Sequence, residues 1–148
     1  MNSLRSHEPE TPHLAVDLDI LERNIARAAG DATARGSALR PHAKTHKMPE
    51  IARMQVASGA IGLTLATVSE AQIFADAGID DIFIAYPVWP SRARAARLRE
   101  LAERITLRIG VDSIEGAEAL GAALRSTSAD ESVGVLIEVD SGHHRSGV

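Results

Sequence analysis

Five short apolar segments recur at nearly even intervals, and this spacing constrains the fold more than any other feature. They begin at residues 37, 61, 82, 105 and 133, so successive starts lie 24, 21, 23 and 28 residues apart. We expect them to form β-strands at Ser37–Ala43, Ile61–Ala66, Ile82–Tyr86, Ile105–Val111 and Val133–Val139. Each interval has room for one helix, which predicts right-handed βαβ units in an α/β protein with a parallel sheet.

Helical patterns occupy these intervals. The predicted helices are Pro49–Ser58, Ser69–Ala77, Ser91–Arg104 and Ile114–Ser126, with Ser69 and Ser113 as candidate N-caps.

One more helix should precede the first strand, and residues 1–10 are expected to be a disordered lead. Asp19 is its candidate N-cap, with Glu22 at capping-box spacing. Its apolar residues recur at helical spacing (Leu21, Ile25, Ala28 and Ala29), and the helix should end before Gly36.

Two architectures use this alternation of strands and helices: a doubly wound open sheet and a (β/α)₈ barrel of the TIM type. No Gly-x-Gly-x-x-Gly motif follows any predicted strand, which weakens a dinucleotide-binding interpretation. A closed barrel needs eight strands and about 250 residues, whereas this chain has 148. The barrel hypothesis therefore predicts a truncated N-terminal part with about five βα units.

Composition narrows the classes of partner. The net charge of −4 argues against a general nucleic-acid binder, and cysteine is absent, so thiolate metal sites are excluded. No apolar run approaches the roughly 20 residues that span a bilayer. Residues 1–12 lack the apolar stretch of a secretory signal. We expect a cytoplasmic protein that binds neither nucleic acid nor membrane.

A basic segment ends the first predicted strand. In a strand, Arg40, His42, Lys44 and His46 would share one face because residues two apart do so. A lysine crowded by cations loses its proton more readily, and the neutral amine is a nucleophile. Lys44 is thus a candidate nucleophile. Two imidazoles without a carboxylate are a poor metal site, so we favour hydrogen-bonding roles for His42 and His46 over metal ligation.

Further polar residues follow the other predicted strands. They are Thr67 after the second, Tyr86 at the end of the third, Asp112 and Ser113 after the fourth, and the segment Asp140–Val148 after the fifth. Ligands bind at the carboxyl ends of strands in both architectures. Basic groups at the first and fifth strands predict an anionic ligand, phosphorylated or carboxylated. Of His143 and His144, one at most should face it.

The segment Arg40–Lys47 resembles the fold-type III pyridoxal-phosphate enzymes. Within them it is most similar to the group of D-threonine aldolase and metal-dependent D-serine dehydratase, whose barrel is like the alanine racemase N-terminal domain. Thr11–Asp19, Leu65–Ala71 and Val139–Val148 resemble further segments of that group. The likeness runs in unbroken order over residues 11–148, which we interpret as a partial pyridoxal-phosphate-binding barrel domain.

The resemblance implies roles for individual residues. Lys44 matches the lysine that bonds covalently to pyridoxal 5′-phosphate, and Arg145 matches an arginine near the phenolic oxygen of this cofactor. His42 and Thr67 are expected to contribute to the cofactor site. A divalent metal (Mn, Mg or Zn) is implied for the complete enzyme. Its ligands and the phosphate-binding segments are expected on later strands, outside this chain.

The implied activity is that of a lyase. It cleaves D-threonine and related D-β-hydroxy amino acids to glycine and an aldehyde by a retro-aldol reaction. The alternatives are a D-serine dehydratase, an amino-acid racemase and a truncated product without turnover. Because half a barrel leaves strand edges unpaired, we expect the 148-residue chain alone to fold poorly and to be inactive. The resemblance leaves monomer and homodimer open.

Overall fold

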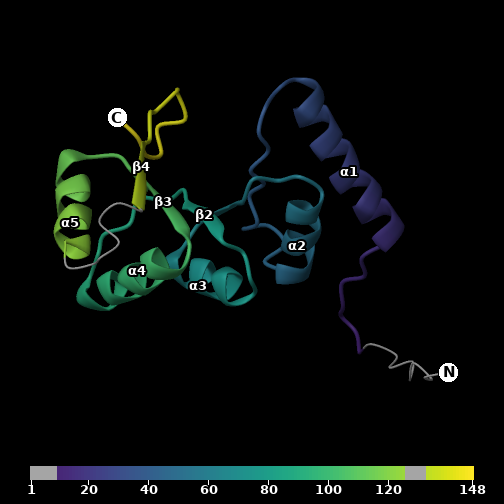
Figure 1. The fold of residues 1–148 in the computed structure, drawn as a ribbon, viewed down its shortest axis with the longest axis horizontal. Helices are drawn as coiled ribbons and strands as arrows, with labels where there is room; N and C mark the ends of the chain where they lie inside the picture. The colour runs from purple at the N-terminus through teal and green to yellow at the C-terminus, as the bar shows by residue number, and fades with distance from the viewer. Residues whose placement is uncertain (1–9, 126–132) are drawn as a thin grey trace.

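The computed structural model describes residues 10–125 and 133–148, and a parallel sheet forms its centre (Figure 1). The strands are β1 (Leu63–Leu65), β2 (Asp81–Ile84), β3 (Thr106–Val111) and β4 (Val133–Ile137). Each pairs in parallel with the next, in the order β1-β2-β3-β4. A doubly wound sheet reverses its strand order at one point, whereas this order is sequential, as in a barrel.

The predicted first strand is reduced to one bridge. His42 pairs in parallel with Thr64, and the backbone N–H of Thr64 donates to Pro41 O at 2.8 Å. Pro41 has no N–H to give to a ladder, and the chain turns directly afterwards, over residues 43–46. The segment therefore lies beside β1 as predicted, but a regular strand over Ser37–Ala43 was wrong.

The helices between the strands confirm the predicted pattern. They are α2 (Pro49–Ala57), α3 (Val68–Asp76), α4 (Arg92–Arg104) and α5 (Ile114–Leu124). Ser113 caps α5 as expected, since its hydroxyl accepts the N–H of Gly116. The cap of α3 is Thr67 and not Ser69, because the Thr67 hydroxyl accepts the N–H of Glu70. Ser126 lies outside the described residues.

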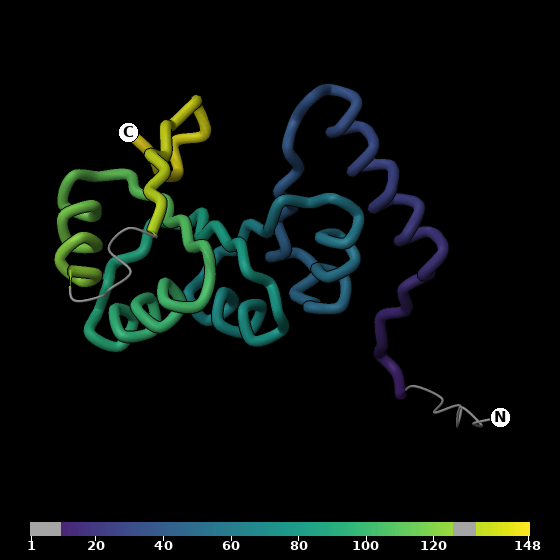
Figure 2. Tube along the Cα trace, viewed as in Figure 1, coloured from purple at the N-terminus to yellow at the C-terminus, as the bar shows by residue number. Residues whose placement is uncertain are grey.

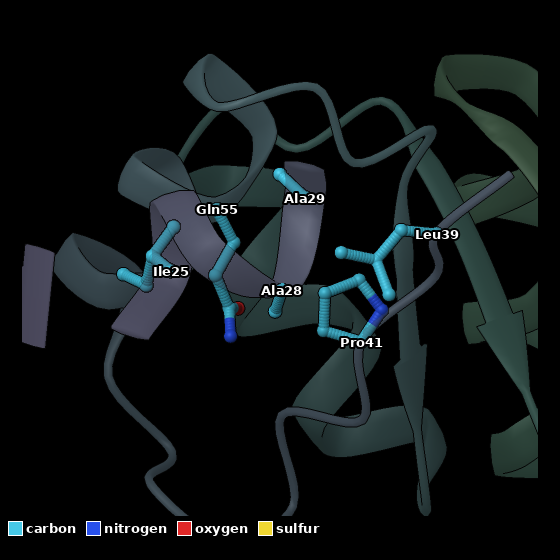
Figure 3. A pocket seen from close by; sticks show the side chains of 6 residues that line it. All are labelled: Ile25, Ala28, Ala29, Leu39, Pro41 and Gln55. Atoms are coloured by element: carbon cyan, nitrogen blue, oxygen red, sulfur yellow. The ribbon is translucent and has the colours of Figure 1, made fainter. Parts of the chain in front are cut away.

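Helix α1 (Leu18–Ala34) lies beyond α2, at the N-terminal end of the molecule (Figure 1). Its cap is Asp17, whose carboxylate accepts the N–H of Ile20, so the prediction of Asp19 was wrong by two residues. The helix ends before Gly36, as expected. A small apolar cavity of about 90 Å³ separates it from α2, lined by Ile25, Ala28, Ala29, Leu39, Pro41 and Gln55 (Figure 3). The predicted disordered lead falls on residues 1–9, which are not described, and on Glu10.

The hydrophobic core lies between the sheet and helices α3, α4 and α5. Alternate strand residues point into it and are buried: Leu63, Leu65, Ile82, Ile84, Leu107 and Ile109. Phe74 of α3 and Leu98 and Leu101 of α4 belong to the same cluster. This alternation is expected for strands that carry helices on one face.

The opposite face of the sheet carries a polar cluster around Asp81. The Asp81 carboxylate accepts a hydrogen bond from Arg40 at 2.7 Å and another from Arg108, so one acid joins the first segment, β2 and β3. Gly62 lies beneath this cluster with φ +148°, and a Cβ there would overlap the Asp81 carbonyl oxygen and the Arg40 guanidinium. A glycine is required at this position because the ion cluster occupies the space of a side chain.

The tube in Figure 2 shows the C-terminal loop folding back beside β4. The N–H of Val148 donates to Glu138 O, and the N–H of Asp140 donates to Val148 O, both at 3.0 Å. Strand β4 is at the edge of the described sheet, and the side chains of Val135 and Ile137 are exposed. No helix within the described ranges is long and apolar enough to cross a membrane.

Candidate active site

Lys44 lies in a tight turn at the carboxyl end of the first segment. The turn covers residues 43–46 and is closed by the N–H of Lys47, which donates to Ala43 O at 2.9 Å. Lys44 is exposed, and its ammonium has no ion pair among the described residues. The turn breaks the strand periodicity after His42. The expectation that four basic residues share one face was therefore wrong.

Arg40 does not crowd Lys44. Its guanidinium is half-buried and bound to Asp81, on the face of the sheet opposite the helices. Asp81 begins β2, whereas Lys44 lies at the carboxyl end of the first segment, so the predicted crowding of Lys44 by Arg40 does not occur.

His42 lies directly beside the Lys44 turn. Its Nδ1 accepts the backbone N–H of Lys44 at 3.2 Å, which requires an unprotonated Nδ1. Burial lowers the pKa of His42, and the nearby Lys44 charge lowers it further, while Glu70 opposes both. The imidazole is therefore neutral at pH 7 and holds the main chain of the turn.

His46 points away from Lys44, into the helix layer. Its Nδ1 accepts the N–H of Met48 at 3.1 Å, and its ring meets the edge of Phe74, with the ring centroids 6.5 Å apart. Burial lowers the pKa of His46, opposed by the Gln55 amide. His42 and His46 thus lie on different sides of the turn. Each ring accepts a backbone N–H through its Nδ1.

Thr67 ends the loop after β1 and caps α3. Its Oγ1 accepts the N–H of Glu70 at 3.1 Å, which leaves the hydroxyl proton free to donate to a ligand. A cavity of about 240 Å³ opens here at the carboxyl ends of β1 and β2. It is lined by Ala66, Thr67, Val68, Tyr86, Pro87, Val88 and Arg94. The structure thus places Thr67 and Tyr86 on one concave surface.

Arg145 belongs to the loop after β4. The Asp140 carboxylate orders this loop by accepting the N–H groups of Gly142, His143 and His144. These hydrogen bonds lower the pKa of Asp140, and the one from the backbone N–H of His144 has the largest effect. Partial desolvation opposes them. Both histidines are exposed, and His144 Nδ1 lies 2.7 Å from Asp140 Oδ2.

The predicted site residues fall into two groups. His42, Lys44 and Thr67 cluster around the first segment and β1, because Thr64 of β1 pairs with His42. Arg145 is exposed and follows β4, at the other edge of the described sheet. Lys44 and Arg145 therefore lie at the two ends of the described sheet. In a barrel, strands at such positions face each other across the interior.

The sequence interpretation missed Glu70. Its carboxylate pairs with Lys47 at 3.1 Å and accepts the N–H groups of Ala66 and Thr67 at 3.0 and 3.2 Å. The signal was present, since Thr67 and Glu70 have capping-box spacing. Within the described ranges, no three His, Asp or Glu side chains are grouped so that they could hold a metal ion.

Comparisons with known proteins agree with this geometry. The family described as alanine racemase, N-terminal domain, matches residues 16–148. The D-threo-3-hydroxyaspartate dehydratase of Delftia sp. (strain HT23) is 41% identical over 140 residues, which cover 94% of this chain and 36% of that protein. The D-threonine aldolase of Arthrobacter sp. is 40% identical over 139 residues, covering 94% and 36%.

A solved structure extends the likeness to the backbone. The D-threonine aldolase from Filomicrobium marinum superposes with a TM-score of 0.87 at 39% identity, over 94% of this chain and 37% of that one. The chain thus spans about a third of the length of the relatives it matches. It belongs to the alanine racemase N-terminal domain family, within the fold-type III pyridoxal-phosphate group, and its sheet and helices are the N-terminal part of that group's (β/α)₈ barrel.

Proposed function

We propose that this chain carries the cofactor-binding lysine of a pyridoxal-phosphate-dependent lyase that acts on D-β-hydroxy amino acids. One observation carries the proposal: Lys44 presents an exposed amine, without an ion pair among the described residues, at the carboxyl end of the sheet. Active sites of barrel enzymes lie at this end.

The residues around Lys44 fit the cofactor. An aldehyde needs an accessible amine, and Lys44 is accessible. Neutral His42 fixes the main chain of the turn through the N–H of Lys44. Thr67 can donate a hydroxyl proton, and Arg145, at the other end of the sheet, offers a cation for an anionic oxygen. When bound, pyridoxal phosphate acts as an electron sink that weakens the bonds to the substrate Cα.

The substrate class follows from what similar proteins share. The relatives include a D-threonine aldolase, a D-threo-3-hydroxyaspartate dehydratase, 3-hydroxy-D-aspartate aldolases and D-serine dehydratases. Every substrate in these names is a D-amino acid with a hydroxyl on Cβ. We therefore propose such a small molecule as substrate.

Two reactions are compatible with that substrate. Retro-aldol cleavage requires a base that takes the proton of the β-hydroxyl, whereas dehydration requires a base for the Cα proton and loss of the hydroxyl. We propose the aldolase reaction, in which a divalent metal, held by residues other than those described, would acidify the β-hydroxyl. The dehydratase is the second candidate, favoured by the 41% identity to the Delftia enzyme.

Covalent trapping tests the proposal. The chain is incubated with pyridoxal phosphate and reduced with borohydride, and peptide mass spectrometry locates the adduct. We expect it on Lys44. Lys44→Arg should abolish it because a guanidinium does not form the bond, while Lys47→Arg, the matched control, should retain it. An adduct that persists in Lys44→Arg, or no adduct in the unmodified chain, would overturn the proposal.

A further inference from the structure

The chain contains only two lysines, Lys44 and Lys47, beside fourteen arginines. Lys44 lies within the turn, and Lys47, three residues later, directly follows it. An aldehyde that enters here therefore meets two side-chain amines. A covalent bond to the wrong one would misplace the cofactor by the width of the turn. The site needs a device that distinguishes the two lysines.

Glu70 contacts only one of them. Its Oε1 lies 3.1 Å from the Nζ of Lys47, and the described residues give Lys44 no such partner. The other oxygen, Oε2, accepts the N–H groups of Ala66 and Thr67. One carboxylate therefore ties the Lys47 ammonium to the end of β1 and to the first turn of α3.

The charge of Glu70 is secured by its surroundings. Burial favours the neutral acid, but the hydrogen bonds from Lys47 and from the N–H groups of Ala66 and Thr67 outweigh it, and the pKa of Glu70 is lowered. The carboxylate is ionised at neutral pH. Its side chain is 14% exposed, against 65% for that of Lys47, so the acid is the fixed partner of the pair.

The backbone of Lys47 supplies an independent observation. Its φ is +53°, in the left-handed region that glycine adopts most easily. A lysine at such a position is strained, and the strain persists only where surrounding contacts hold it. Two contacts hold Lys47: the hydrogen bond from its backbone N–H to Ala43 O and the ion pair of its Nζ with Glu70. Glu70 thereby fixes the exit of the turn that presents Lys44.

We propose that Glu70 is a positioning residue that selects Lys44 over Lys47 as the cofactor-binding amine. This inference rests on the proposed function. Glu70 binds the Nζ of Lys47 in an ion pair, which keeps this amine from the aldehyde, and it fixes the geometry of the turn. Lys44 has no such partner among the described residues and would be the amine that condenses with the aldehyde: its ammonium would release one proton to solvent, the two remaining amine protons would leave with the carbonyl oxygen as water, and a C=N bond would replace the C=O bond.

The test measures where and how fast pyridoxal phosphate bonds to the protein. Glu70→Gln keeps an amide oxygen for the N–H groups of Ala66 and Thr67 but loses the charge that binds Lys47. We expect the share of reduced adduct on Lys47 to rise and the rate at Lys44 to fall on the order of tenfold. Asp76→Asn, which breaks an exposed ion pair with Arg104, is the matched control and should change neither quantity.

A double variant separates selection from positioning. Lys47→Arg removes the competing amine and keeps the cation for Glu70, so it should react at Lys44 at the unmodified rate. Glu70→Gln combined with Lys47→Arg leaves one reactive lysine. A slower reaction of this double variant than of Lys47→Arg measures the loss of positioning. Melting temperatures identify any variant that fails to fold.

The outcomes are distinguishable. If the unmodified chain forms no adduct on Lys44, the proposed function falls and this inference with it. If the adduct forms on Lys44 but its rate and its distribution are unchanged in Glu70→Gln, the inference alone is overturned. A redistribution toward Lys47 together with a slower double variant supports both parts.

Discussion

Asp81 is the centre of the polar cluster on the face of the sheet opposite the helices. It is 24% exposed and receives hydrogen bonds from Arg40 and Arg108, two guanidinium groups that are themselves largely covered. The cluster joins three neighbouring segments of the sheet. Its contribution is therefore larger than that of an exposed ion pair, because removing the acid leaves two partly buried cations facing each other.

We predict that Asp81→Asn lowers the free energy of unfolding by about 1–3 kcal/mol, since the amide keeps one acceptor but not the charge. Asp76→Asn serves as the control, because exposed ion pairs contribute about 0–1 kcal/mol. Urea denaturation followed by circular dichroism measures both. An Asp81→Asn chain as stable as Asp76→Asn would show that the cluster is not a stabilising element.

His42 and His46 give the chain an acid sensitivity. Burial lowers the pKa of both in the folded state, so the unfolded chain binds protons more tightly at these positions. Their contribution to stability is fully present above the usual histidine pKa of about 6.5 and is lost as the pH falls toward the lowered folded values. Lowered pKa values of Glu70 and Asp140 extend the loss to more acidic pH.

We predict that the free energy of unfolding falls between pH 7.5 and pH 5, and that a variant with both histidines replaced by glutamine loses less over this range. Urea titrations at several pH values measure the slope. Equal slopes in the two proteins would contradict the assignment of this dependence to His42 and His46.

At the scale of elements, regular periodicity was sufficient to predict the helices between the strands, but local turns were not predictable from it. The predicted strand Ser37–Ala43 is replaced by a single bridge and a turn, and side chains hold that turn in place. His42 captures the N–H of Lys44, and Glu70, distant in sequence, holds Lys47. The local sequence around Lys44 does not show that Glu70 contacts this turn. The cap of α3 was misplaced for a related reason, because two hydroxyl residues, Thr67 and Ser69, compete for it.

The effect of replacing a glycine by alanine depends on the element and on the space around it. Gly62 precedes β1 with φ +148°, beneath the Asp81 cluster, whereas Gly121 lies on the exposed side of α5, with open space where a methyl group would lie. We predict that Gly62→Ala destabilises the fold by several kcal/mol through strain and overlap. Gly121→Ala should stabilise it by up to about 1 kcal/mol through helix propensity. Thermal melts of both variants measure the difference, and two shifts of the same sign would contradict it.

At the scale of the molecule, strand spacing predicted an α/β fold with a parallel sheet, and the sequential strand order selects the barrel over the doubly wound sheet. The candidate site was predicted only in part. Lys44 was singled out from its motif and stays a prediction, whereas the direction of His46 and the contacts of Glu70 depend on packing against α2 and α3. Such contacts form between segments that the sequence does not mark as neighbours.

We predict that the 148-residue chain self-associates and does not cleave D-threonine. Strand β4 exposes Val135 and Ile137 at 54% and 71%, beside backbone groups at the edge of the described sheet. Exposed apolar edges of this kind pair with other chains. Light scattering after size exclusion measures association, and an acetaldehyde assay measures cleavage. A monodisperse monomer that releases acetaldehyde from D-threonine would contradict both expectations.

The separation of Lys44 and Arg145 by the width of the described sheet has a mechanical consequence. A ligand that touches both side chains links the two ends of the sheet, so its binding free energy adds to the stability of the arrangement in which both ends reach it. Pyridoxal phosphate would then cross-link the two ends, and its occupancy would report their separation. Fluorescent labels on the two edges should move closer as the cofactor concentration rises.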